Sequence, residues 1–173
     1  MSRWRMERAF SLLVLASVLA SGGLFSACTP ASVLEVSRQD THEPVLCTSV
    51  QQGEEFIISF THSVNRRPVY DTLRVETDHL VIVGSRFDAF GAGMPETSTE
   101  DGALTVGEDG WLLWTVNRPV PEVVVRVGRV ADHSLRIKEK DLRLADLAPP
   151  GTALRFQVRR ATLIDRMKGR YLP

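Results

Sequence analysis

Hydrophobic and polar residues alternate along much of the chain from about residue 55 to residue 160. In EFIISFTHS, residues 55–63, every second residue from Phe56 to His62 falls on one face, and polar residues occupy most of the other face. VYDTLRVET, residues 69–77, shows the same alternation. A period of two is typical of a β-strand that buries one face, so both segments are predicted to be strands.

Other short segments have strand character and are separated by Gly, Asp, Pro or Asn. No amphipathic segment of helical length lies between them, which favours an all-β, single-domain fold, either an antiparallel β-sandwich or an open barrel. A short helix or tail is expected at 161–173. The further predicted strands are 33–37, 44–50, 79–87, 102–107, 111–117, 121–128, 133–139 and 153–160.

The first 28 residues have the pattern of an export signal. Three arginines and one glutamate lie within residues 3–8, and an uncharged stretch follows from Ala9 to Ala27. The sequence LFSAC, which ends at Cys28, resembles the lipobox of bacterial lipoproteins, in which the cysteine is acylated and becomes the new N-terminus. An ordinary secretory cleavage site and an uncleaved membrane span are the alternatives. Phe25 departs from the secretory cleavage motif and also from the usual lipobox. The serines and glycines of this stretch make a permanent membrane-spanning helix less favourable.

These features predict three segments: a lipoprotein signal peptide at 1–27, a tether at 28–43 and a β domain at 44–173. Acyl chains on Cys28 would anchor the protein at the periplasmic face of a membrane. Cys28 and Cys47 are the chain's two cysteines, and lipidation of Cys28 would exclude a disulfide between them. We expect Cys47 to be a half-buried core residue, because no basic cluster flanks it.

The charge balance gives no reason to expect nucleic-acid binding. Without residues 1–27, the 21 basic and 21 acidic residues of the chain become 18 and 20. A slightly acidic chain lacks the basic footprint that DNA and RNA require.

Two titratable residues, His62 and Asp71, fall in the apolar phase of neighbouring predicted strands. If 56–63 and 69–76 form a hairpin, the apolar faces coincide, and His62 lies opposite or diagonal to Asp71. An unpaired buried carboxylate is costly, so a hydrogen bond between the two side chains is predicted. The pair is expected either to be structural or to bind a ligand, and Ser63 and His133 are further candidate binding residues.

Catalytic and metal sites are less well supported by the sequence. Ser63 follows His62 directly, so on a strand its hydroxyl points to the opposite face, and a Ser-His-Asp triad is not expected. Ser85 is one of several other serines, but none lies in a nucleophile-elbow motif. The four histidines show no ligand spacing for a metal, and no cofactor is expected.

The segment SRFDAFGAGMPE, residues 85–96, is a glycine-containing loop. Gly91 and Gly93 allow backbone conformations that other residues avoid, and Pro95 restricts the exit. Its backbone N–H groups could receive an anionic ligand, although a tight connection between strands is an equally simple interpretation.

The segments FIISFTHSVNRRPVYDTLRV and RFDAFGAGMPE, followed by HSL and APPGTALRFQV, resemble an uncharacterised bacterial family, number eighteen-fifty among the domains of unknown function. The resemblance covers residues 45–159. The family's motif positions would be His62, Ser63, Val64, Pro68, Asp71, Gly91, Gly93 and Pro95. It implies a small exported protein, often encoded beside a TRAP transporter whose solute receptor is of the TAXI class.

Together these observations predict a membrane-anchored lipoprotein that acts as a non-enzymatic accessory or binding subunit of a TAXI-type TRAP uptake system. Its partners would be the permease or the solute receptor, and a small carboxylate or a partner's loop would enter the mouth near His62, Asp71 and residues 90–95. The alternatives are an envelope hydrolase or metal-dependent enzyme that uses His62 and Asp71, and a structural envelope protein.

Overall fold

The computed structural model describes residues 32–161, and the fold is almost entirely β, which confirms the predicted fold class. Two antiparallel sheets form an open sandwich rather than a closed barrel. The predicted signal peptide, Cys28 and the predicted C-terminal helix or tail lie outside the described residues, apart from the first residue of the tail. The elements are β1 (Ser32–Arg38), β2 (Pro44–Val50), β3 (Glu55–Thr61), β4 (Pro68–Val75), β5 (Leu80–Phe87), β6 (Ala103–Val106), β7 (Leu112–Val120), β8 (Glu122–Arg126), β9 (Ser134–Ile137), β10 (Lys140–Arg143), α2 (Leu144–Leu147) and β11 (Ala153–Arg160).

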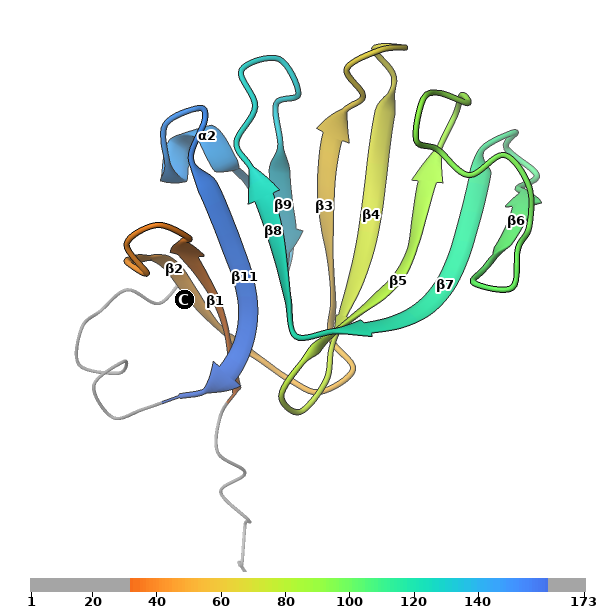
Figure 1. Cartoon of the computed structure of the whole chain (residues 1–173). Coiled ribbons are helices and arrows are strands. Elements are labelled where there is room, and N and C mark those ends of the chain that lie inside the picture. The colour runs from red at the N-terminus through yellow and green to blue at the C-terminus, as the bar shows by residue number, and fades with distance from the viewer. Residues whose placement is uncertain (1–31, 162–173) are drawn as a thin grey trace, which may run out of the picture.

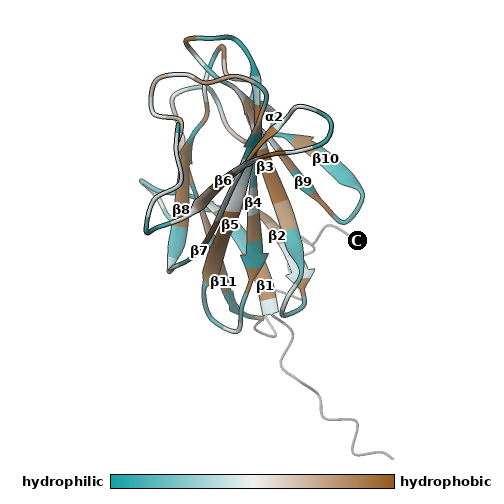
Figure 2. Cartoon of the chain, turned by 90° about the vertical axis from the view of Figure 1, so that its right-hand side faces the viewer, coloured by the Kyte–Doolittle hydropathy of each residue, from teal (hydrophilic) through white to brown (hydrophobic). Residues whose placement is uncertain are grey.

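The strand order is β2-β1-β11-β8 in the smaller sheet and β10-β9-β3-β4-β5-β7-β6 in the larger one (Figure 1). The main core lies between them, where Phe56 of β3 stacks on Phe156 of β11 with ring centroids 6.5 Å apart. A smaller cluster around Val69, Phe87 and Leu112 lies on the β4-β5-β7 part of the larger sheet. Figure 2 shows the hydrophobic residues concentrated on the strands, whereas the connecting loops are mostly hydrophilic.

Pro121 alone separates β7 from β8, so the chain passes directly from the larger sheet into the smaller one (Figure 1). Proline has no backbone N–H to donate to a strand ladder, which suits a residue at such a corner. The inner face of this corner is where the candidate site lies.

The predicted strand at 33–37 is confirmed as β1, and because it lies within the predicted tether at 28–43, that boundary is too late. Residues 32–38 pair with β2 on one side and with β11 on the other. Five consecutive residues of β1, from Val33 to Ser37, are buried, so this strand lacks the alternation that marks a half-buried strand. The β domain therefore includes residues 32–43 as well.

Two elements were not predicted, β10 and the single helical turn α2. Both are four residues long, too short for a recognisable period. Cys47 is a core residue of β2 as expected, but it is buried rather than half-buried, with 4% of its surface exposed. Among residues 32–161, no helix has the length and apolar character needed to cross a lipid bilayer.

Candidate functional site

In the hairpin of β3 and β4 the apolar faces of the two strands coincide as predicted, but His62 and Asp71 do not pair. Phe56 lies opposite Leu73, and Ile58 opposite Asp71, so the two apolar faces coincide as expected. β3 ends at Thr61, which pairs with Pro68, and the connection takes up residues 62–67. His62 therefore begins the turn, four residues beyond the partner of Asp71 along the strand, and the predicted hydrogen bond between His62 and Asp71 is wrong.

His62 instead links two loops at one end of the sheet. The residue is 8% exposed, and its Nδ1 accepts a hydrogen bond from the backbone N–H of Val64, 3.3 Å away. Its Nε2 lies 3.1 Å from the carbonyl oxygen of Ala92, so the tautomer that fits both contacts carries its proton on Nε2. The imidazole thus joins the 62–67 turn to the loop after β5.

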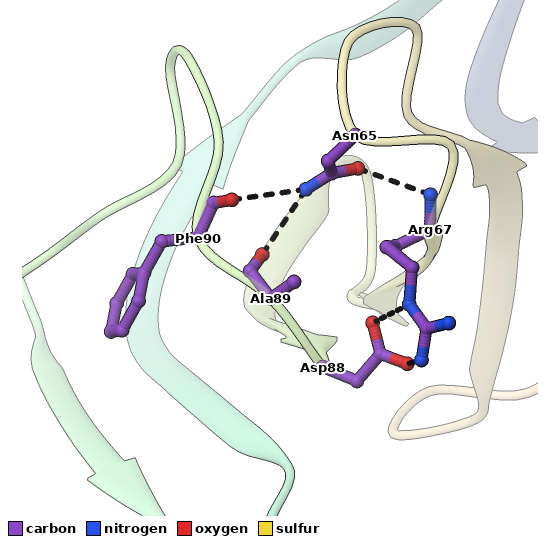
Figure 3. A network of polar contacts seen from close by, with 5 residues as sticks. All are labelled: Asn65, Arg67, Asp88, Ala89 and Phe90. Carbon is purple, nitrogen blue, oxygen red and sulfur yellow. Dashed lines mark hydrogen bonds and ion pairs between the residues drawn. The ribbon is translucent and has the colours of Figure 1, made fainter.

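Asn65, which the sequence did not single out, makes the second link between these loops (Figure 3). Its amide Nδ2 donates to the carbonyl oxygens of Phe90, at 3.1 Å, and Ala89, at 3.4 Å, while its Oδ1 accepts from the backbone N–H of Arg67. The Arg67 guanidinium also forms an ion pair with Asp88 and lowers the pKa of that carboxyl. These contacts of Asn65 and Arg67 hold the 62–67 turn against the loop that follows β5.

Gly91 and Gly93 allow the turn and the close approach to His62 that the loop after β5 makes. The carbonyl of Gly91 accepts from the backbone N–H of Met94 at 3.0 Å, which closes a four-residue turn. Gly93 has a φ of 84°, a conformation that the third position of a type II turn requires. A Cβ on Gly91 would lie 3.0 Å from Cε1 of His62, so glycine lets the loop approach the ring. Ser63, also predicted as a binding residue, is exposed at the tip of the 62–67 turn.

We expect the His62→Ala variant to lower the free energy of unfolding by about 1–3 kcal/mol, because it leaves backbone groups of two loops without their partner. Urea unfolding measures this loss, and amide hydrogen exchange should increase at Val64 and in residues 89–94. His79→Ala is the matched control: this ring is partly exposed, and its hydrogen bond joins it to its chain neighbour Asp78 rather than to another loop, so the stability of this variant should be close to that of the wild type. Equal stability of the two variants would show that His62 does not join the loops.

A cavity of about 1060 Å³ lies inside the corner between the two sheets. It is bounded by β3, β4, β5 and β7 of the larger sheet, by β8 of the smaller one and by residues 95–101. Its walls are mainly apolar, with Ile58, Leu73, Ile82, Trp114, Val123 and Val125 among the lining residues. Pro95 and His133, two of the predicted site residues, also line it.

Asp71 and Ser85 form the polar part of the strand face that lines this cavity. They are cross-strand partners on β4 and β5, and the Ser85 hydroxyl donates a hydrogen bond of 2.5 Å to Oδ1 of Asp71. Burial raises the pKa of the Asp71 carboxyl, and the hydrogen bond from Ser85 opposes that rise. An irregularity in β5 pairs Thr72 with Gly84 and Leu73 with Ile82, so Ile82 rather than Val83 lies beside Leu73 in the cavity wall.

His133 lies at another side of the cavity. Its ring centroid is 5.5 Å from that of Phe60, and its Nδ1 accepts from the backbone N–H of Gly128 at 3.3 Å. Burial lowers the pKa of His133, and the charge of Asp132 opposes this, so the ring is held toward its neutral form.

The structure therefore divides the predicted site residues into two groups. Asp71, Pro95 and His133 line the cavity, whereas His62, Gly91 and Gly93 build the adjoining loops. Ser85 and Trp114 complete the cavity and were not predicted as binding residues. The sequence did contain a signal for Ser85: it is a polar residue in the apolar phase of its strand, as Asp71 is in the preceding strand. Within residues 32–161, no three His, Cys, Asp or Glu side chains come together in a way that would hold a metal ion.

Comparison with known proteins identifies the family of the chain. No curated protein and no solved structure matches the chain significantly. The model of one family, described as Domain of unknown function (DUF1850), matches residues 56–144, a span that runs from β3 to the start of α2 and includes His62, Asp71, Ser85 and His133. The match covers just over half of the chain and agrees with the resemblance seen in the sequence motifs. The chain therefore belongs to the Domain of unknown function (DUF1850) family.

Proposed function

We propose that this protein is an exported lipoprotein that binds a small molecule in its corner cavity and acts as a non-enzymatic subunit of a TAXI-type TRAP uptake system. The observation that carries the binding function is the cavity itself. Ligand sites in proteins are concave, mainly apolar and equipped with a few polar groups, and they measure about 300–1,000 Å³. The cavity of about 1060 Å³, with Asp71 and Ser85 among apolar walls, matches this description.

The position of the chain's N-terminal part supports a tethered arrangement. Figure 1 shows β1 beginning at the lower end of the molecule, whereas the connections after β3, β5 and β8 lie at the upper end. Cys28 precedes Ser32 by four residues, which is at most about 14 Å of extended chain. With Cys28 lipidated, the loops held together by His62 and Asn65 would face away from the membrane, toward a solute receptor in the periplasm.

The enzyme alternative loses its main support, because it needs His62 and Asp71 as a base and its orienting partner. The imidazole of His62 is engaged with the backbone of Val64 and Ala92, and Asp71 is engaged with Ser85. Neither arrangement presents the hydrogen bond between base and orienting group that general-base catalysis uses.

The lipoprotein part of the proposal is tested by the Cys28→Ser variant. We expect wild-type protein in the membrane fraction and the variant in the soluble periplasmic fraction or retained as uncleaved precursor, because the serine hydroxyl cannot take the thioether-linked lipid. Cys47→Ala, which changes the other cysteine, should leave the protein in the membrane fraction. Mature Cys28→Ser protein that remained membrane-bound would contradict a lipid anchor.

The association with an uptake system is tested by co-purification of the tagged wild-type chain from native membranes. Mass spectrometry should identify a TRAP permease or a TAXI-class receptor in the eluate. The soluble Cys28→Ser protein provides the control for nonspecific capture, since it lacks the membrane position on which the complex depends. Recovery of neither component from native membranes would contradict the accessory role.

A further inference from the structure

The charges around the cavity are predominantly negative. Four carboxyl groups but two guanidinium groups line the cavity. One of the two guanidinium groups, that of Arg126, already donates a hydrogen bond of 2.8 Å to the carbonyl oxygen of Gly151. The remaining basic side chain of the lining is His133, which burial holds toward its neutral form. The four carboxyl groups are Asp71, Glu96, Glu100 and Asp101.

Asp71 differs from the other three because it lies on the strand face rather than in the exposed 95–101 loop. It forms no ion pair within residues 32–161, and Ser85 occupies its Oδ1. The fully buried side-chain atoms that lack a partner in that part of the chain are Ser37 Oγ and Arg155 Nε. Oδ2 of Asp71 also has no hydrogen-bond partner among these residues but is not fully buried, so part of its surface is accessible, and Asp71 lines the cavity.

A carboxylate without a cationic partner among apolar side chains is costly. The ordinary remedy, a neighbouring Arg or Lys, is missing at Asp71 within the described chain, although Ser85 orients one of its oxygens. A ligand that brings a positive charge and N–H donors would supply the missing partner, and a carboxylate ligand would add a second negative charge. An indole face such as that of Trp114 also attracts a cation.

We infer that the cavity binds a small organic cation, a protonated amine on an apolar body, with the ammonium group at Oδ2 of Asp71 and the apolar body against Leu73, Ile82 and Trp114. This inference rests on the proposed binding function of the cavity. The arrangement of charge favours such an amine over the small carboxylate that the sequence suggested.

The test compares three compounds of similar size and different charge: 2-phenylethylamine, 2-phenylethanol and 3-phenylpropanoate. Calorimetric titration of the purified full chain at neutral pH should show the amine binding about tenfold or more tightly than either of the others. Asp71→Asn keeps the shape of the side chain and an acceptor for Ser85 but removes the charge, so it should weaken amine binding by about tenfold or more. Asp78→Asn removes the charge of a carboxyl that is 87% exposed and does not line the cavity, so it should leave amine affinity within about twofold.

The outcomes separate this inference from the proposed function. Preferential binding of 3-phenylpropanoate would overturn the amine assignment and leave a ligand-binding cavity. Amine binding that Asp71→Asn leaves unchanged would also overturn it, provided that circular dichroism shows the variant folded. Binding of none of the three compounds by folded wild-type protein would contradict the binding function and the amine assignment together. The comparison of compounds on wild-type protein decides the question even if the variant does not fold.

Discussion

The Gly84→Ala variant is expected to lower the free energy of unfolding by more than about 3 kcal/mol. Gly84 lies in β5 beside the irregularity that shapes the cavity wall, and it pairs with Thr115 of β7. A Cβ at this position would lie 2.1 Å from the carbonyl oxygen of Trp114. That atom belongs to the backbone of β7, so no side-chain rotation relieves the clash, and the two strands must separate where Trp114 lines the cavity.

Gly110→Ala is the matched control for this prediction. Gly110 has a φ of 79°, but a Cβ there would meet no atom within 4 Å. Its replacement should cost only the backbone strain of a left-handed residue, about 1–2 kcal/mol. Urea unfolding of both variants measures the difference, and equal losses would contradict the close approach of β5 to β7.

The Phe156→Ala variant is expected to lose about 3–5 kcal/mol of stability, because it leaves a cavity in the main core. Phe156 of β11 is fully buried, and its ring stacks on Phe56 of β3 with an interplanar angle of 15°. This contact joins the smaller sheet to the larger one, so its removal should weaken the packing between the two sheets.

Phe90→Ala is the control, because it also removes a phenyl ring but from an exposed position. The Phe90 side chain is 50% exposed and touches the ring of Phe87 by its edge. We expect it to cost less than about 1 kcal/mol. Thermal or urea unfolding compares the pair, and a Phe156 variant as stable as the Phe90 variant would show that the two sheets do not share a core at this point.

The alternation of residue types was enough to predict the fold class and the facing of the central hairpin. Phe56, Ile58 and Phe60 share a face with Val69 and Leu73 in the structure, as their spacing indicates. What the pattern could not supply was the register. It depends on where β3 ends and on how six connecting residues turn, including Arg66 with a φ of 59°, and a polar turn sequence allows several such arrangements.

The same limitation explains the outcome for the candidate site. An aspartate in an apolar phase correctly indicated that Asp71 needs a polar partner, but matching the apolar faces of the two strands predicted His62 as that partner. The partner, Ser85, lies on the next strand, and its alignment with Asp71 depends on the irregularity beside Gly84. Cross-strand pairs on a sheet with bulges cannot be read from periodicity alone.

The central claim is that the carboxyl group of Asp71 faces the cavity and recognises the ligand, and carbon-13 NMR of that carboxyl as a function of pH tests it most directly. Burial disfavours the charged form, so the pKa of Asp71 in the free protein should lie above the ordinary value for aspartate. Saturation with 2-phenylethylamine should lower this pKa, because an ammonium group beside the carboxylate stabilises its charged form. An ordinary pKa that saturating amine does not change would contradict the claim.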